Sequence, residues 1–318
     1  MQIVNNSGTR RLQFDNDCYK NERSFEVVES KKDIGECMFS GVNEFEKNRY
    51  SVSKDQEFAH LNETLTEMRD FLNELGYLAF GRDMSFLRRM GPVNGNIILD
   101  SAIRTMESIR YCCLNANFAD AYTLLRKYRD DLFYYLYLFT VADNSDFTQF
   151  VDIDQLSEDE KNIWDWVHNQ QKDLHIGSVL KCIASHPSAR KAVHDFKLKD
   201  SFDELADKLN NYVHSNGRMF YNESFDGLVI KRKTQEECNE FGKAAIFITI
   251  AFLFLAVLIN PLLIMSYDYT DYLDCGDTPP DDSQYWVAPF VSDFLNKYKN
   301  VLDEKCDCYL REKTGMQI

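Results

Sequence analysis

The longest apolar stretch of the chain runs from Ala244 to Ser266 and contains no charged residue. As a helix it would be about 34 Å long, enough to cross a hydrocarbon core of about 30 Å. The stretch therefore predicts a transmembrane helix. Asn260 and Pro261 interrupt it near its end, and proline often ends or kinks a helix. A buried core helix followed by a short second segment is the alternative interpretation.

The charges on either side of this stretch predict its orientation. Basic residues precede it, and only acidic ones follow it before Lys297: Lys231, Arg232, Lys233 and Lys243, then Asp268, Asp271, Asp274, Asp277, Asp281 and Asp282. An excess of Lys and Arg marks the cytoplasmic side of a membrane helix. The pattern predicts a single-pass membrane protein with a cytoplasmic N-terminal domain and an external tail. The lipid bilayer is its first predicted partner.

Apolar residues recur every three or four positions along much of the remaining chain, which is typical of amphipathic helices. One such helix begins near Ser53. Two more, from Asp100 to Cys113 and from Phe118 to Val141, are joined by a short turn and so form an antiparallel hairpin. Further helices follow a capping box at Ser157 and lie near residues 178–184, 188–196, 201–213 and 224–240. The predicted fold class is mostly α, a helical bundle with one transmembrane helix.

These patterns divide the chain into four parts. Residues 1–52 are polar and predict a poorly ordered N-terminal segment. Residues 53–243 form the cytoplasmic helical domain, 244–266 the transmembrane helix, and 267–318 an acidic loop plus a C-terminal amphipathic helix. That last helix carries an apolar stripe that includes Val291, Phe294 and Tyr298. A stripe of this kind needs a covering surface, and a tail folded back on the helical domain would supply one.

Composition narrows the function classes. A formal net charge of −15 argues against broad binding of nucleic acids, which needs a basic face. The nine cysteines are scattered and form no CxxC pair, so a zinc ribbon or a thioredoxin-type motif is not predicted. No phosphate-binding glycine loop occurs. The sequence predicts neither a metal site nor a cofactor.

Two polar patches are candidate sites. The first lies in the predicted helix 118–141, where Arg126, Arg129 and Asp130 interrupt an apolar pattern. The second lies at the end of the predicted helix 201–213, where Lys208 and Asn211 precede His214. Together they could form a local anion site. The alternative is an ion-pair network around Asp130 and a histidine that hydrogen-bonds to a carbonyl at the end of its helix.

The helical hairpin with a basic second helix, followed by a polar helix ending in Tyr-Val-His-Ser-Asn-Gly, resembles the HEPN superfamily, in particular its abortive-infection-type members. The resemblance covers about residues 95–217. It implies a metal-independent endoribonuclease, in which an Arg holds the phosphate, a His four to six residues later is the general acid/base, and a homodimer brings two motifs together. His214 matches the His, and Asn210 and Asn211 replace the usual polar neighbour. Lys208 occupies the Arg position but lacks its bidentate fork, so Arg126 or Arg129 would have to substitute.

Three hypotheses follow. The leading one is a bacterial membrane-associated helical protein that acts through protein contacts, with stress or phage defence implied by the family resemblance. The second is the HEPN-like ribonuclease, for which RNA is the partner. The third is a soluble helical bundle in which the apolar helix is buried. They differ in whether His214 faces a phosphate held by a cation, and in whether Ala244 to Met265 is surrounded by other helices.

Overall fold

A computed structural model describes residues 56–80, 96–115, 117–144, 153–170, 176–214, 231–303 and 305–318. All of these residues belong to one unit, which comprises residues 45–318. The prediction for residues 1–52 lies outside the described residues. Within them, the prediction of a mostly α-helical bundle is confirmed. The helices are α2 (Gln56–Phe80), α4 (Asn96–Leu114), α5 (Phe118–Asn144), α6 (Glu158–Val167), α7 (Ile176–Ser185), α8 (Pro187–Asp195), α9 (Leu198–Val213), α11 (Lys231–Ile259), α12 (Asp268–Cys275), α13 (Pro289–Tyr298) and α14 (Cys306–Thr314).

Three helices form the first layer of the bundle. The predicted hairpin is confirmed as α4 and α5, whose connection is only three residues long, residues 115–117. The α4 helix also packs against α2, and the two run antiparallel, because Arg69 of α2 contacts Glu107 while the Asn96 side chain donates to the Gly76 carbonyl. Their shared core consists of the apolar positions that the three-and-four pattern predicted.

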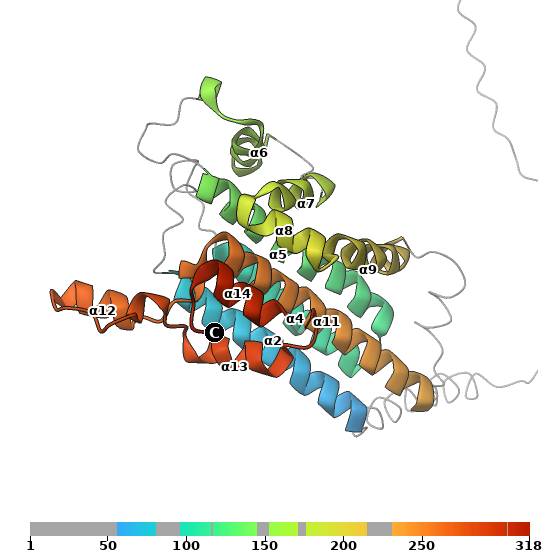
Figure 1. The fold of residues 1–318 in the computed structure, drawn as a ribbon. Helices are drawn as coiled ribbons and strands as arrows, with labels where there is room; N and C mark the ends of the chain where they lie inside the picture. Colours follow the sequence, from blue (N-terminus) through green and yellow to red (C-terminus); the bar gives the residue numbers. More distant parts are fainter. Residues whose placement is uncertain are drawn as a thin grey trace, which may run out of the picture. The chain divides into compact units, whose positions relative to one another are not determined.

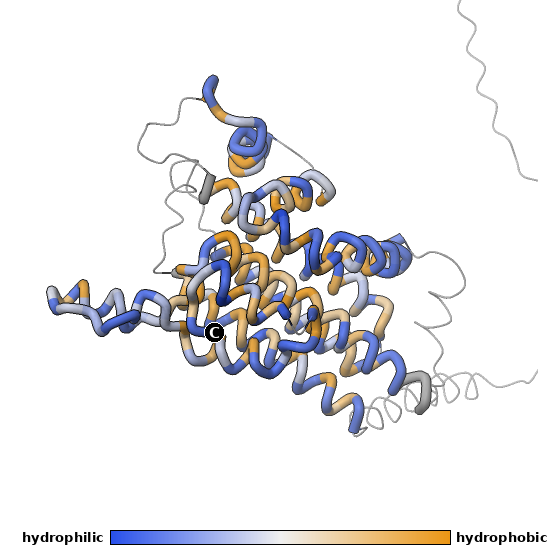
Figure 2. Tube along the Cα trace, in the orientation of Figure 1, coloured by the Kyte–Doolittle hydropathy of each residue, from blue (hydrophilic) through white to orange (hydrophobic). Residues whose placement is uncertain are grey.

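The apolar helix α11 lies at the centre of the bundle (Figure 1) and packs against α2, α5, α8, α13 and α14. It runs parallel to α5, since Tyr122 of α5 contacts Glu237 near its start and Tyr128 contacts Thr249 farther along. Every residue from Ile248 to Ile259 is buried. Figure 2 shows the same concentration of apolar residues along α11 and the helix faces around it. The helix therefore has no solvent-facing side over its last three turns.

The one hydroxyl in the buried half of α11 is satisfied from both sides. Thr249 donates to the Ala245 carbonyl at 2.9 Å, and the Tyr128 hydroxyl lies 2.8 Å from Thr249 Oγ1. A hydroxyl has one proton and two acceptor sites. Because Thr249 has already used its proton, Tyr128 is the donor between the two side chains. Burial raises the pKa of Tyr128 well above its ordinary value and keeps that proton in place.

An outer layer covers α5 on its far side. The α7 helix packs on α5, and α9 runs antiparallel to it. The register of α9 is set by two ring contacts, Tyr122 stacked on Tyr212 at 4.5 Å and Phe133 edge-on to Phe202 at 4.7 Å. The capping box at Ser157 is confirmed, since its hydroxyl accepts from the Glu160 backbone amide while the Glu160 carboxylate accepts from the Ser157 amide.

The C-terminal tail returns to the bundle. The ring of Phe294 in α13 stacks on Phe71 of α2 at 3.8 Å, and Tyr309 of α14 contacts Phe254 of α11 at 6.2 Å. The stripe predicted on the last helix is thus buried against α2, as a folded-back tail requires. Single-pass topology would place this tail and α2 on opposite sides of a bilayer.

Between α11 and α13 the chain forms an arm, residues 267–285. An antiparallel bridge between Met265 and Val287 closes its base. The predicted acidic loop is partly helical here, because α12 forms within it and ends at Gly276 in the left-handed conformation, with φ of 77°. Residues 271–278 are all exposed, and α12 points away from the other helices in Figure 1.

Within the described residues, one helix is long and apolar enough to cross a membrane, Gln235–Ile259. In its most apolar 18-residue segment, 78% is buried inside the bundle. Length and composition support the prediction of such a helix. Its crossing a membrane once, and its orientation, stay predictions.

We expect Leu253→Ala in α11 to lower the free energy of unfolding by about 2–5 kcal/mol, because the side chain is fully buried and its removal leaves a cavity. Leu273→Ala on α12 is the matched control. That side chain is 50% exposed, so its loss should change stability by less than about 0.5 kcal/mol. Urea unfolding of both variants measures the difference, and equal losses would contradict the central position of α11.

Candidate functional site

The predicted basic patch of α5 is a cluster of ion pairs within that helix. Arg129 is only 4% exposed and contacts Asp130 at 2.6 Å, while Arg126 approaches the other oxygen of the same carboxylate at 3.7 Å. Burial raises the pKa of the Asp130 carboxyl, and the charge of Arg129 opposes that shift. The two arginines thus share one carboxylate within α5, as the ion-pair alternative predicts.

The neighbouring cation is engaged in the same way. Lys127 contacts Asp131 at 2.5 Å and donates to the hydroxyls of Ser101 and Thr105 on α4. This cluster joins α4 to α5. It fixes the register of the hairpin and leaves the Lys127 charge balanced.

Lys208, which occupies the phosphate-binding position of the resemblance, contacts α11 instead. Its ammonium group lies 2.6 Å from the Glu240 carboxylate and 4.8 Å from the centre of the Tyr122 ring. The Tyr122 hydroxyl in turn donates to Glu237 at 3.2 Å. The lysine is therefore already paired with a carboxylate, whose charge opposes the approach of a phosphate.

His214 follows the last residue of α9 and is exposed, as is Asn211. The backbone amide of His214 donates to the Asn210 carbonyl at 3.0 Å. The stacking of Tyr212 on Tyr122 fixes the position of His214 along α5. At 1.5 Å per residue, the seven positions from Tyr122 to Arg129 move that arginine about 10 Å farther along the antiparallel helix. The predicted site residues are thus placed along one helix pair, with Arg129 turned into the bundle and His214 at its end.

Buried thiols in the described part of the chain are unsuited to nucleophilic chemistry. Burial raises the pKa of Cys113 well above its ordinary value and that of Cys182 and Cys306 to about 12. The thiolate is the nucleophile and the metal ligand, so these three cysteines stay protonated. No group of three or more His, Cys, Asp or Glu among the described residues is placed to hold a metal ion.

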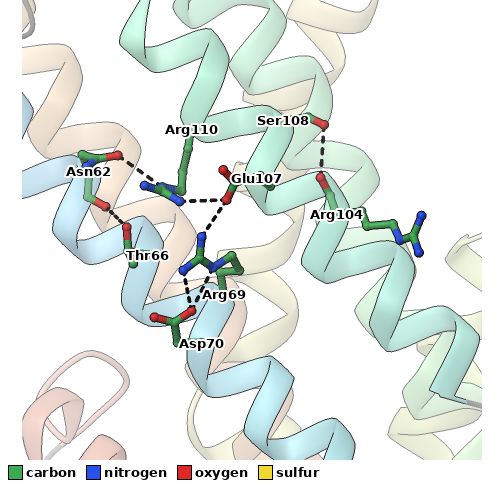
Figure 3. A network of polar contacts seen from close by, with 8 residues as sticks. All are labelled: Asn62, Thr66, Arg69, Asp70, Arg104, Glu107, Ser108 and Arg110. Atoms are coloured by element: carbon green, nitrogen blue, oxygen red, sulfur yellow. Dashed lines mark hydrogen bonds and ion pairs between the residues drawn. The ribbon is translucent and has the colours of Figure 1, made fainter.

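A polar network between α2 and α4 was not predicted from the sequence (Figure 3). Glu107 accepts from Arg69 at 2.9 Å and from Arg110 at 2.7 Å, and Arg110 also donates to Asn62. Hydrogen bonding by Arg69 lowers the pKa of the Glu107 carboxyl. The second edge of the Arg69 guanidinium holds Asp70. The network ties the two helices together along their exposed side.

Beside this network, an open groove of about 510 Å³ lies between α2 and α13. Its lining combines three phenylalanines with five carboxylates and one lysine. The residues that line it are Asn62, Glu63, Thr66, Glu67, Asp70, Phe71, Glu74, Phe290, Asp293, Phe294 and Lys297. The spacing of apolar residues predicted the buried face of α2. Nothing in the sequence of its acidic face predicted that another helix would lie beside it. Only the stripe on the last helix indicated that another surface would meet it.

Comparison with family models, with curated proteins and with solved structures finds no match to this chain. The resemblance to the HEPN superfamily therefore stays a prediction that rests on the residues quoted for it.

We expect Arg129→Ala to destabilise the fold by about 3 kcal/mol, the lower end of the cost of breaking a buried ion pair, because Arg126 remains beside Asp130. Lys208→Ala removes a more exposed pair and should cost less than about 1 kcal/mol. Thermal unfolding of the two variants separates a structural role of Arg129 from a purely catalytic one. If Arg129→Ala unfolds at the wild-type temperature, the cluster does not hold the helices together.

Proposed function

We propose that this chain is a helical-bundle protein that acts through contacts with other proteins and that α11 serves as its core helix. The observation that carries the proposal is the arm, residues 267–285. It exposes Tyr272 and Leu273, at 42% and 50%, on a helix that buries no residue of its own. A helix that buries no residue of its own, on an arm closed at its base by backbone hydrogen bonds, is suited to present a surface to a partner.

The charges at the predicted catalytic positions favour this proposal over the ribonuclease. Arg126 and Arg129 share the carboxylate of Asp130, and Lys208 is paired with Glu240. A phosphate would have to displace carboxylates that the fold itself holds in place, at a cost in stability. Stress or phage defence, which the resemblance implies, remains the predicted setting for a protein of this kind.

The burial of α11 favours a core helix over a membrane span. To cross a bilayer alone, α11 would have to leave α2 and α5, whose faces carry Leu65, Leu72 and Tyr128, all buried. Exposing such side chains to water costs about 1.5–3 kcal/mol each. The membrane-associated form of the proposal therefore requires a rearrangement of the whole bundle.

The ribonuclease alternative has a direct test. Purified full-length chain should produce no cleavage of a single-stranded RNA in EDTA above that of a His214→Ala preparation purified in parallel. Product formation is measured on denaturing gels. Metal-independent cleavage that His214→Ala abolishes would overturn the proposal.

Localisation has a separate test. We expect alkaline carbonate to release the full-length chain from cell membranes, because its apolar helix is covered by the rest of the protein. A known single-pass protein in the same extract is the control for retention in the pellet. If the chain is retained with that control, α11 spans the membrane and the core-helix part of the proposal fails.

A further inference from the structure

The groove between α2 and α13 has an apolar floor. Phe71 and Phe294 stack on each other and are 5% and 4% exposed, so they form the bottom of the groove. Phe290 lies at 5.8 Å from the Phe71 ring and is only partly covered. From Asn62 to Glu74 the lining follows α2 for about 18 Å at 1.5 Å per residue. The lining of the groove is therefore long enough for three turns of a helix.

The rim of the groove is acidic, with five carboxylates and one ammonium group. Lys297 and the Tyr298 hydroxyl both contact Glu67, and Arg69 contacts Asp70. Glu63, Glu74 and Asp293 are exposed and have no ion-pair partner in the described part of the chain. The rim thus presents three negative charges without an ion-pair partner in the described part of the chain, around an apolar floor.

We propose that this groove docks a basic amphipathic helix of a partner protein, with apolar side chains on Phe290 and Lys or Arg side chains toward Glu63, Glu74 and Asp293. An amphipathic helix laid in an apolar groove is a common form of peptide recognition. The sign of the rim selects a basic partner, and it repels nucleic acid and acidic segments. The proposal deepens the proposed function, since it rests on this protein acting through protein contacts.

The probe for this surface is a fluorescein-labelled 14-residue peptide of Lys and Leu that places all its leucines on one helical face. Binding is measured by fluorescence anisotropy with the full-length chain in 0.15 M salt. Two triple variants change the net charge equally. The groove variant is Glu63→Gln with Glu74→Gln and Asp293→Asn. The control variant is Asp200→Asn with Glu204→Gln and Asp207→Asn, which changes three exposed carboxylates on α9. Circular dichroism verifies that both are folded.

We expect the groove variant to weaken binding of the peptide at least tenfold and the control variant to weaken it less than threefold. A peptide with the same composition in scrambled order should bind at least tenfold more weakly than the amphipathic one, because it has no continuous apolar face for the floor. Phe290→Ala should weaken binding of the amphipathic peptide alone.

Equal losses in the two triple variants would mean general attraction to an acidic protein and would overturn the proposed groove. So would equal affinity for the two peptides, or no binding of either. These outcomes leave the proposed function standing, because it is decided by the RNA cleavage and the carbonate experiments, and its own failure would appear there.

Discussion

The structure depends on covering one helix that is apolar on every side. From Ile248 to Ile259 no position of α11 faces solvent, and a helix of this kind is stable in water only if other helices surround it. No single neighbour can cover all sides of a helix. The tail and the outer helix α8 therefore join α2 and α5 around it. The order of the elements follows from this requirement, since the last segments of the chain return to complete the cover.

The polar side chains that α5 and α11 bury against each other are paired, because an unsatisfied buried group costs more than a hydrogen bond gains. Thr249 and Tyr128 satisfy each other between α11 and α5. The buried Arg129 is paired with Asp130, whose side chain is 20% exposed. The residues that the sequence marked as a candidate catalytic site therefore have a structural role as ion-pair partners. Arg126, Arg129 and Asp130 pair with one another within α5, and this explains how they stand inside an otherwise apolar helix.

Local features of the fold could be predicted from the sequence, and long-range ones could not. The α4–α5 hairpin and the capping box at Ser157 follow from spacing within a few residues. Lys208 pairs with Glu240, and Lys297 pairs with Glu67. These residues are far apart in the chain, so no pattern of neighbouring residues predicts the pairs. The apolar stretch shows the limit most clearly. A membrane helix and a central core helix have the same composition, and only the neighbours distinguish them.

The same reasoning explains why the groove arises where it does. The α13 helix is held to α2 at one end by Tyr298 on Glu67 and along its middle by Phe294 on Phe71. On its other side α2 is tied to α4 through Glu107. No helix among the described residues covers the strip of α2 between these two attachments, and its lining is rich in carboxylates. Had another helix of this chain been required there, the strip would carry apolar residues. The carboxylates of this strip are suited to contact with water or with a basic partner. The groove beside α13 therefore combines a surface that the core does not use with charges that favour a basic ligand.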